Sequence, residues 1–144
     1  MARSFAALEV KGLKEVLSRL NNVPKEVAKE IDLELQASAR VIVREAKANV
    51  RGRVKNENGA LLNAISYEHK GDMSYEVVAQ KFYAPFVEFG TGTRVNVPAG
   101  LEEYAMQFYR GPGVNIPATP YLFPAYEEER KKLIDRLKNI IKTI

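Results

Sequence analysis

Glu88 is the residue whose type and surroundings most suggest acid–base chemistry. It stands in the aromatic-rich segment Tyr83-Ala84-Pro85-Phe86-Val87-Glu88-Phe89, which runs into Gly90-Thr91-Gly92. A carboxylate among apolar side chains is at least partly shielded from water and needs hydrogen-bond or charged partners. It could be a general acid with a raised pKa, but glycoside hydrolysis needs a second nearby carboxylate, and the sequence identifies none. We favour a structural carboxylate that accepts hydrogen bonds from the Gly90-Thr91-Gly92 amides or from an arginine; a partner on a neighbouring subunit is the third alternative.

His69 is the single histidine of the chain, so any catalytic arrangement with an imidazole base would have to use it. The sequence indicates neither a positioned nucleophile nor an orienting carboxylate beside it, which favours a structural or solvent-facing histidine. One histidine, no cysteine and no Asp-x-Asp-x-Asp-Gly loop give no metal site. We therefore expect no enzyme, no metal and no cofactor, and a hydrolase built on Glu88 and His69 is the least favoured alternative.

The segment Gly90-Thr91-Gly92-Thr93-Arg94 has the small residues and the arginine that can hold a phosphate group. However, no Gly-Lys-Ser/Thr follows, and the third glycine of a dinucleotide fingerprint is missing. The glycines are better explained by a sharp turn that needs a positive φ.

A basic stretch at Arg51, Arg53 and Lys55 could face DNA, in a segment that we predict to be an exposed loop over residues 51–59. No aromatic side chain is interleaved with these cations, so the contact would be sequence-independent and made to phosphates. The net charge of +4 is small for a DNA-binding domain. A solvated loop is the preferred interpretation.

Two long helices and a hairpin have to position these residues. Apolar residues at helical spacing predict a short helix over Leu13–Leu20, a long one from Lys25 to Val50, and a charged amphipathic helix at the C-terminal end. The middle of the long helix is apolar on more than one side, so it should be packed from two directions. Alternating residues on either side of Gly71-Asp72 predict a β-hairpin in which Val78 lies on the polar face with Ser74 and Glu76.

The fold class that follows is α+β, with the long N-terminal helix and the C-terminal helix packed on a small antiparallel β-sheet. We expect one domain over residues 1–144, because its length and composition suit one soluble core. Residues 93–116 form a long connection with a short helix from Gly100 to Tyr109. Its aromatic residues suggest a segment that orders on a surface. No apolar run reaches the roughly 20 residues of a transmembrane helix, so we expect no membrane contact.

Two aromatic segments, Tyr83 to Thr91 and Pro117 to Ala125, follow Gly59, Leu61-Leu62 and the hairpin around Gly71. In this arrangement the chain resembles the tail-completion, or head–tail joining, proteins of long-tailed (siphovirus-type) bacteriophages. The resemblance implies a virion structural protein that forms a ring, commonly a hexamer, between the connector of the DNA-filled head and the tail tube. The implied partners are further copies of the chain, head-completion or connector proteins, tail tube or tail terminator proteins, and viral DNA in the lumen.

The implied location is the neck or tail of the virion, after assembly in the host bacterial cytoplasm. Ring contacts are heterologous, so each subunit needs two different surfaces. We expect residues from both aromatic segments and from the long connection at subunit or partner interfaces: Tyr83, Phe86, Glu88, Phe89, Thr91, Arg94, Tyr104, Phe108, Tyr109 and Tyr121. Two alternatives remain: a tail terminator or minor tail component, and a sequence-independent DNA-binding module.

Overall fold

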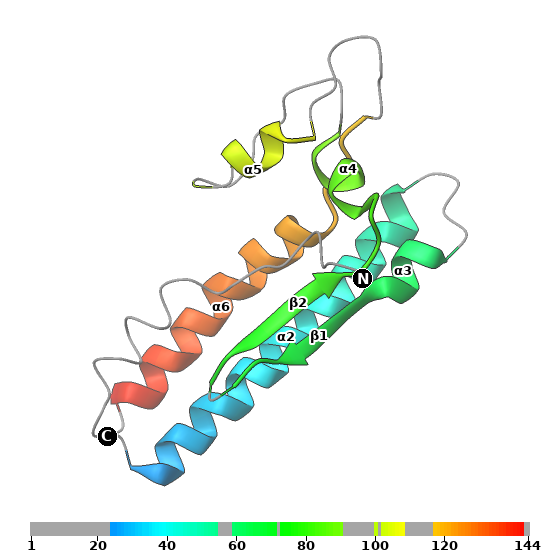
Figure 1. The fold of residues 1–144 in the computed structure, drawn as a ribbon. Coiled ribbons are helices and arrows are strands. Elements are labelled where there is room, and N and C mark those ends of the chain that lie inside the picture. The colour runs from blue at the N-terminus through cyan, green and yellow to red at the C-terminus, as the bar shows by residue number, and fades with distance from the viewer. Residues whose placement is uncertain are drawn as a thin grey trace.

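The computed structural model describes residues 24–54, 59–71, 73–90, 100, 102–108 and 117–142. Its elements are, in chain order, α2 (Lys25–Arg53), α3 (Ala60–Ala64), β1 (Ile65–His69), β2 (Tyr75–Ala79), α4 (Ala84–Phe89), α5 (Glu102–Met106) and α6 (Leu122–Lys142). Figure 1 shows two long helices side by side with the hairpin lying along α2. The α+β fold class is therefore confirmed. The predicted helix over Leu13–Leu20 lies outside the described residues.

Helix α2 begins directly after Pro24, whose ψ of 146° is not helical. Its buried residues recur every three or four positions along one side: Ile31, Leu35, Ser38, Ala39, Ile42, Ala46 and Val50. The helix does not end at Val50 as predicted, but continues to Arg53. Val54 explains the extra turn, because its side chain packs on the core and its amide donates to the carbonyl of Val50 at 3.1 Å. Arg51 and Arg53 are consequently helical, and the prediction of a loop from residue 51 was wrong for this part.

The two strands pair antiparallel on either side of the predicted turn, with Ile65 opposite Ala79 and His69 opposite Tyr75. The amide of Lys70 donates to the carbonyl of Ser74 at 2.8 Å and closes the turn. The predicted alternation fails at one position, because Val78 is only 1% exposed although it was placed on the polar face. Helix α3 packs against the end of the hairpin that lies away from the turn, where Ile65 pairs with Ala79.

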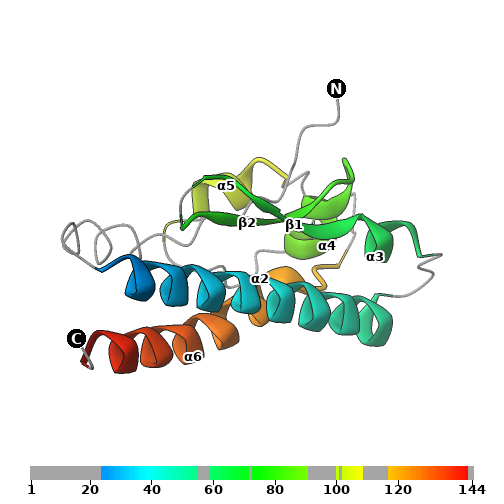
Figure 2. The same cartoon turned by 90° about the horizontal axis from the view of Figure 1, so that it is seen from below.

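Helix α2 lies between the hairpin and α6, as Figure 2 shows from below. A first apolar cluster joins α2 and α6 through Ile31, Leu35, Leu133, Leu137 and Ile140. A second, larger cluster joins the C-terminal half of α2 to the hairpin, α4 and the start of α6. The predicted packing of α2 from two directions is confirmed. However, Leu33, one of the apolar residues on which that prediction was based, is 54% exposed.

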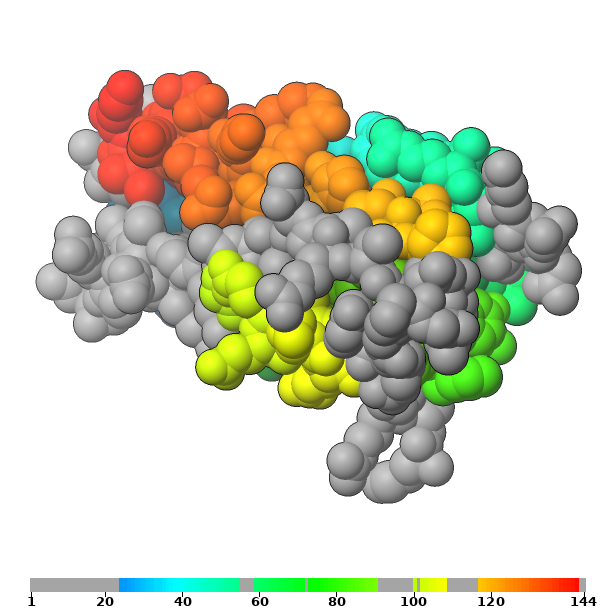
Figure 3. All heavy atoms as spheres, turned by 90° about the horizontal axis from the view of Figure 1, so that it is seen from above, coloured from blue at the N-terminus to red at the C-terminus, as the bar shows by residue number. Residues whose placement is uncertain are grey.

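Helix α6 begins at Leu122, inside the second aromatic segment, and runs antiparallel to α2 (Figure 1). Pro124 is tolerated because it stands in the first turn, where the helix needs no amide donor. Figure 3 shows α6 and the last turns of α2 along one border of the upper face, with α5 towards the opposite border. In the described part of the chain, no helix combines the length and apolar character that crossing a membrane requires.

Candidate functional site

Helix α4 places Glu88 where the two aromatic segments meet. Pro85 lies in the first turn of this six-residue helix, and Gly90 ends it. Gly90 has φ of 71°, a value that L-residues with a side chain rarely adopt, and its amide donates to the carbonyl of Phe86 at 2.8 Å. The predicted positive φ is confirmed for this glycine. Glu88 therefore projects from a short, sharply ended helix.

The Glu88 carboxylate accepts three hydrogen bonds from the backbone at the start of α6. Its Oε2 accepts from the amides of Tyr121 at 2.9 Å and Leu122 at 3.0 Å, and its Oε1 accepts from Phe123 at 2.9 Å. These donors have no acceptor within their own helix, so Glu88 acts as a cap supplied by another element. The expected donors were Gly90-Thr91-Gly92 or an arginine. Among the described residues, the donors instead come from the second aromatic segment.

The side chain of Glu88 is only 2% exposed. Burial raises the pKa of its carboxyl group, while the amide hydrogen bonds from Leu122, Tyr121 and Phe123 oppose that rise. The partial positive charge at the start of α6 also favours a carboxylate at this point.

Further polar contacts tie the same two segments together and to α2. The amide of Thr119 donates to the carbonyl of Val87 at 2.8 Å, and the Tyr121 hydroxyl donates to the carbonyl of Ala84 at 3.3 Å. On the other side, Asn49 Nδ2 of α2 donates to the carbonyl of Tyr121 at 3.0 Å. The chain that leads into α6 is thus held between α4 and the last turns of α2.

Aromatic rings continue this junction into α5. Phe89 lies 5.3 Å from Phe123, 5.8 Å from Tyr104 and 6.0 Å from Phe108, measured between ring centroids. Phe86 meets Phe108 edge to face at 5.2 Å. Such edge-to-face and offset pairs stabilise a packed core. The described part of the 93–116 connection therefore packs on α4 of its own chain.

The predicted interface residues occupy different environments. Glu88, Phe89, Phe108 and Tyr121 are buried within the protomer, and Tyr83, Phe86 and Tyr104 are partly buried. Arg51 and Arg53 are exposed in the last turn of α2, where Arg53 Nη1 lies 3.5 Å from the carbonyl of Pro120. Lys55, Thr91, Arg94 and Tyr109 lie outside the described residues. Their predicted contacts with other subunits or with DNA stay predictions.

Two apolar residues near this junction are exposed, and one of them, Phe82, was not identified from the sequence. Phe82, which precedes α4, is 71% exposed, and its ring meets that of Tyr83 edge to face at 5.3 Å. Met106 on α5 is 47% exposed. The position of Phe82 directly after the polar pair Gln80-Lys81 is the signal that could have indicated an exposed turn. Both residues offer apolar surface to a partner.

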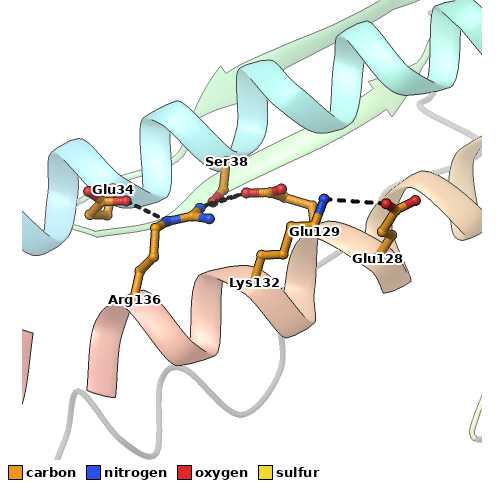
Figure 4. A network of polar contacts seen from close by, with 6 residues as sticks. All are labelled: Glu34, Ser38, Glu128, Glu129, Lys132 and Arg136. Atoms are coloured by element: carbon orange, nitrogen blue, oxygen red, sulfur yellow. Dashed lines mark hydrogen bonds and ion pairs between the residues drawn. The ribbon is translucent and has the colours of Figure 1, made fainter. Parts of the chain in front are cut away.

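A second polar site joins α2 to α6 (Figure 4). Arg136 donates to Glu129 at 2.6 Å, to Ser38 Oγ at 2.7 Å and to Glu34 at 2.8 Å. Ser38 Oγ donates in turn to Glu129 at 2.9 Å. Glu129 is 4% exposed, so its charge is compensated by Arg136 inside the interface. This site was not predicted from the sequence; its signal is polar residues on the apolar faces of both helices.

The groups that a hydrolase would need are far apart in the fold. His69 stands at the turn end of the hairpin, where its ring stacks on Tyr75 at 4.8 Å. Glu88 belongs to α4, which lies at the opposite end of the hairpin (Figure 1). In residues 24–54, 59–71, 73–90, 100, 102–108 and 117–142, no three potential metal ligands among histidines and carboxylates come together.

One protein-family model, described as "Bacteriophage HK97-gp10, putative tail-component", matches residues 14–90. The match covers more than half of the 144 residues. It contains α2, α3, the hairpin and α4 with Glu88, and it ends before the second aromatic segment and α6. No curated protein and no solved structure matches the chain.

Proposed function

This chain belongs to the HK97-gp10-like family of bacteriophage tail components, and from that premise we propose that it joins DNA-filled heads to tails. In this role the protein is a structural part of the virion neck. It forms a ring, with six subunits as the expected number, between the head connector and the tail tube. Viral DNA passes through the lumen of the ring.

The observation that supports this role most directly is the Glu88 junction. A ring subunit must hold two different contact surfaces in a constant relation, because each surface meets a different part of the neighbouring subunit. Glu88 ties α4 to the start of α6 through three backbone hydrogen bonds. The junction therefore gives the surfaces on α4 and on the two long helices one shared geometry.

Apolar surface for assembly is available next to this junction. Tyr104 and Phe108 are engaged with α4, so among the described residues of the 93–116 connection Met106 is the large apolar side chain open to a neighbour. Phe82 is the second exposed anchor. Large apolar side chains that are buried on association supply much of the free energy of binding at interfaces.

Electron microscopy of a lysate from the parent phage or prophage, with this gene disrupted, tests the proposal. Separate DNA-filled heads and tails of mature length are the expected result. Tails of irregular length would overturn the joining role in favour of a tail terminator, and intact infectious particles would overturn it altogether.

Complementation with point variants then tests the contact surface. Phe82→Ser, which removes an exposed ring, should fold normally and reduce the yield of joined particles about tenfold or more. Ser66→Ala, at an exposed position of β1, is the control and should complement fully. Full complementation by Phe82→Ser would exclude Phe82 as an anchor.

A further inference from the structure

One exposed side of α2 carries a row of cations. Arg40, Arg44, Lys47 and Arg51 follow one another at spacings of four, three and four residues. These spacings place all four on the same side of a helix with 3.6 residues per turn, along about 16 Å of its axis. Arg40, Arg44 and Arg51 are exposed and Lys47 is partly buried. We call these four residues the basic row.

The charge of α2 changes sign at its middle. Residues 25–39 contain two lysines and four acidic residues, whereas residues 40–53 contain five cations and a single acid: Arg40, Arg44, Glu45, Lys47, Arg51 and Arg53. Cations near a helix C-terminus stabilise the helix dipole, but that effect acts within the last turn. It accounts for Arg51 and Arg53 and leaves Arg40, Arg44 and Lys47 unexplained.

The contacts of the basic row with the described residues are weak. Arg44 pairs with Glu45 at 3.2 Å, but the Arg44 side chain is 71% exposed, and an ion pair in that setting is weak. Arg40 Nε donates to the Tyr67 hydroxyl at 3.1 Å, and that bond lowers the pKa of Tyr67. Within the described residues, Lys47 and Arg51 form no ion pair.

The composition of the row distinguishes between two kinds of partner. The centre of a protein–protein interface is typically depleted in charge and rich in aromatic residues, and this row has no aromatic member. A phosphate backbone instead needs closely spaced cations and no apolar anchor. The row therefore has the chemistry of a surface for double-stranded DNA.

We propose that the basic row Arg40, Arg44, Lys47 and Arg51 binds the phosphate backbone of double-stranded DNA without sequence preference. The residues differ from the stretch at 51–55 expected from the sequence, with which they share only Arg51. Three of its four side chains are exposed in a single protomer, so DNA binding requires no ring. It can be measured separately from head–tail joining, and failure of one proposal leaves the other intact.

Helix α6 offers a control with matched geometry. Lys131, Asp135, Lys138 and Lys142 repeat the spacings of four, three and four, and all four are exposed, but an acid interrupts the row. Replacing three cations on either helix changes the net charge equally. A difference between the two triple variants therefore reports the arrangement of charge rather than its total.

Fluorescence anisotropy of a 30-base-pair duplex, titrated with the full chain at several salt concentrations, tests the proposal. The wild type should bind with a dissociation constant that rises steeply with salt. Arg44→Gln/Lys47→Gln/Arg51→Gln should weaken binding roughly tenfold or more and reduce the slope of log K against log salt by about 2–3. Lys131→Gln/Lys138→Gln/Lys142→Gln should change the slope by less than about 1. Unchanged circular dichroism would show that both variants fold.

Three results would overturn the proposal. They are no binding by the wild type at low salt, equal losses in the two triple variants, and displacement of the duplex by polyglutamate of matched charge as efficiently as by unlabelled duplex. The last result would identify an acidic protein surface as the better partner.

Discussion

Glu88 and Glu129 are both buried carboxylates, yet the protein stabilises them in opposite ways. Glu88 is held by three backbone amides from the start of α6, and the contacts described for it include no cation. Glu129 is held by the side chains of Arg136 and Ser38. The first arrangement depends on where α6 begins, whereas the second depends on the identity of three side chains. A buried carboxyl group can therefore position a helix end as well as a helix pair.

The two sites also differ in what happens when one partner is removed. Without Glu88, three amide donors at a buried helix start lose their acceptor, and the connection between α4 and α6 is weakened. Without Arg136, the Glu129 carboxylate keeps Ser38 as a donor but loses its compensating charge. Arg136 is more exposed than Glu129, with 38% of its side chain accessible against 5%, so water can partly replace it. We therefore expect the larger loss at Glu88.

Glu88→Ala should have the largest effect, a loss of about 3–5 kcal/mol in the free energy of unfolding, because buried donors are left without an acceptor. Chemical denaturation followed by circular dichroism measures this loss. Glu128→Ala is the control, since Glu128 is 71% exposed and its pair with Lys132 should contribute about 0.5 kcal/mol or less. Equal stability of the two variants would contradict the capping role of Glu88.

Arg136→Met should cost about 2 kcal/mol, because it keeps the length of the side chain but leaves Glu129 without a compensating charge. Adding Glu129→Gln removes that charge and should restore part of the lost stability. The same denaturation experiment on the two single variants and the double variant gives the coupling between them. Strictly additive losses would show that Arg136 and Glu129 are not coupled.

Glu88→Gln should have the smallest effect, about 1 kcal/mol, because the amide retains one acceptor oxygen but directs a donor at a backbone amide. The loss should also depend on pH. Burial raises the pKa of Glu88, so its contribution to stability is complete below the ordinary value of 4.5 and is lost as the pH rises through the raised pKa.

The difference between wild type and Glu88→Gln should accordingly be larger at pH 4 than at pH 7, when unfolding is measured at both. A difference that increases towards neutral pH would show that the helix-start amides outweigh burial. Glu88 would then be a carboxylate stabilised in its charged form.

The sequence predicted the elements with a strong periodic pattern and missed α3 and α4, whereas the short helix predicted from Gly100 to Tyr109 is present as α5 over Glu102–Met106. The hairpin, α2 and α6 were predicted because alternation or helical spacing recurs over several turns or residue pairs. Helix α4 has six residues, with a proline and several aromatic side chains among them, so it presents no period to detect. The end of α2 was misplaced by three residues because Val54, whose packing extends the helix, looked like part of a polar loop.

The candidate site was predictable in its composition but not in its connections. Glu88 and the aromatic segments stood out locally, yet the donors to Glu88 lie 33 to 35 residues further along the chain. Ser38 and Glu129 are separated by 91 residues. Such contacts produce no recognisable pattern in the sequence, because they depend on how the helices pack and not on neighbouring residues.

The sequence by itself determined the order and type of the main elements and the match to a family of phage tail components. These are local properties of side-chain type and spacing, so they can be read before folding. Only the tertiary structure decided that α6 lies antiparallel on α2, that its first amides bind Glu88, and that Arg136 compensates Glu129. The physical reason is that a buried polar group takes whichever partner the packed core brings within hydrogen-bond distance.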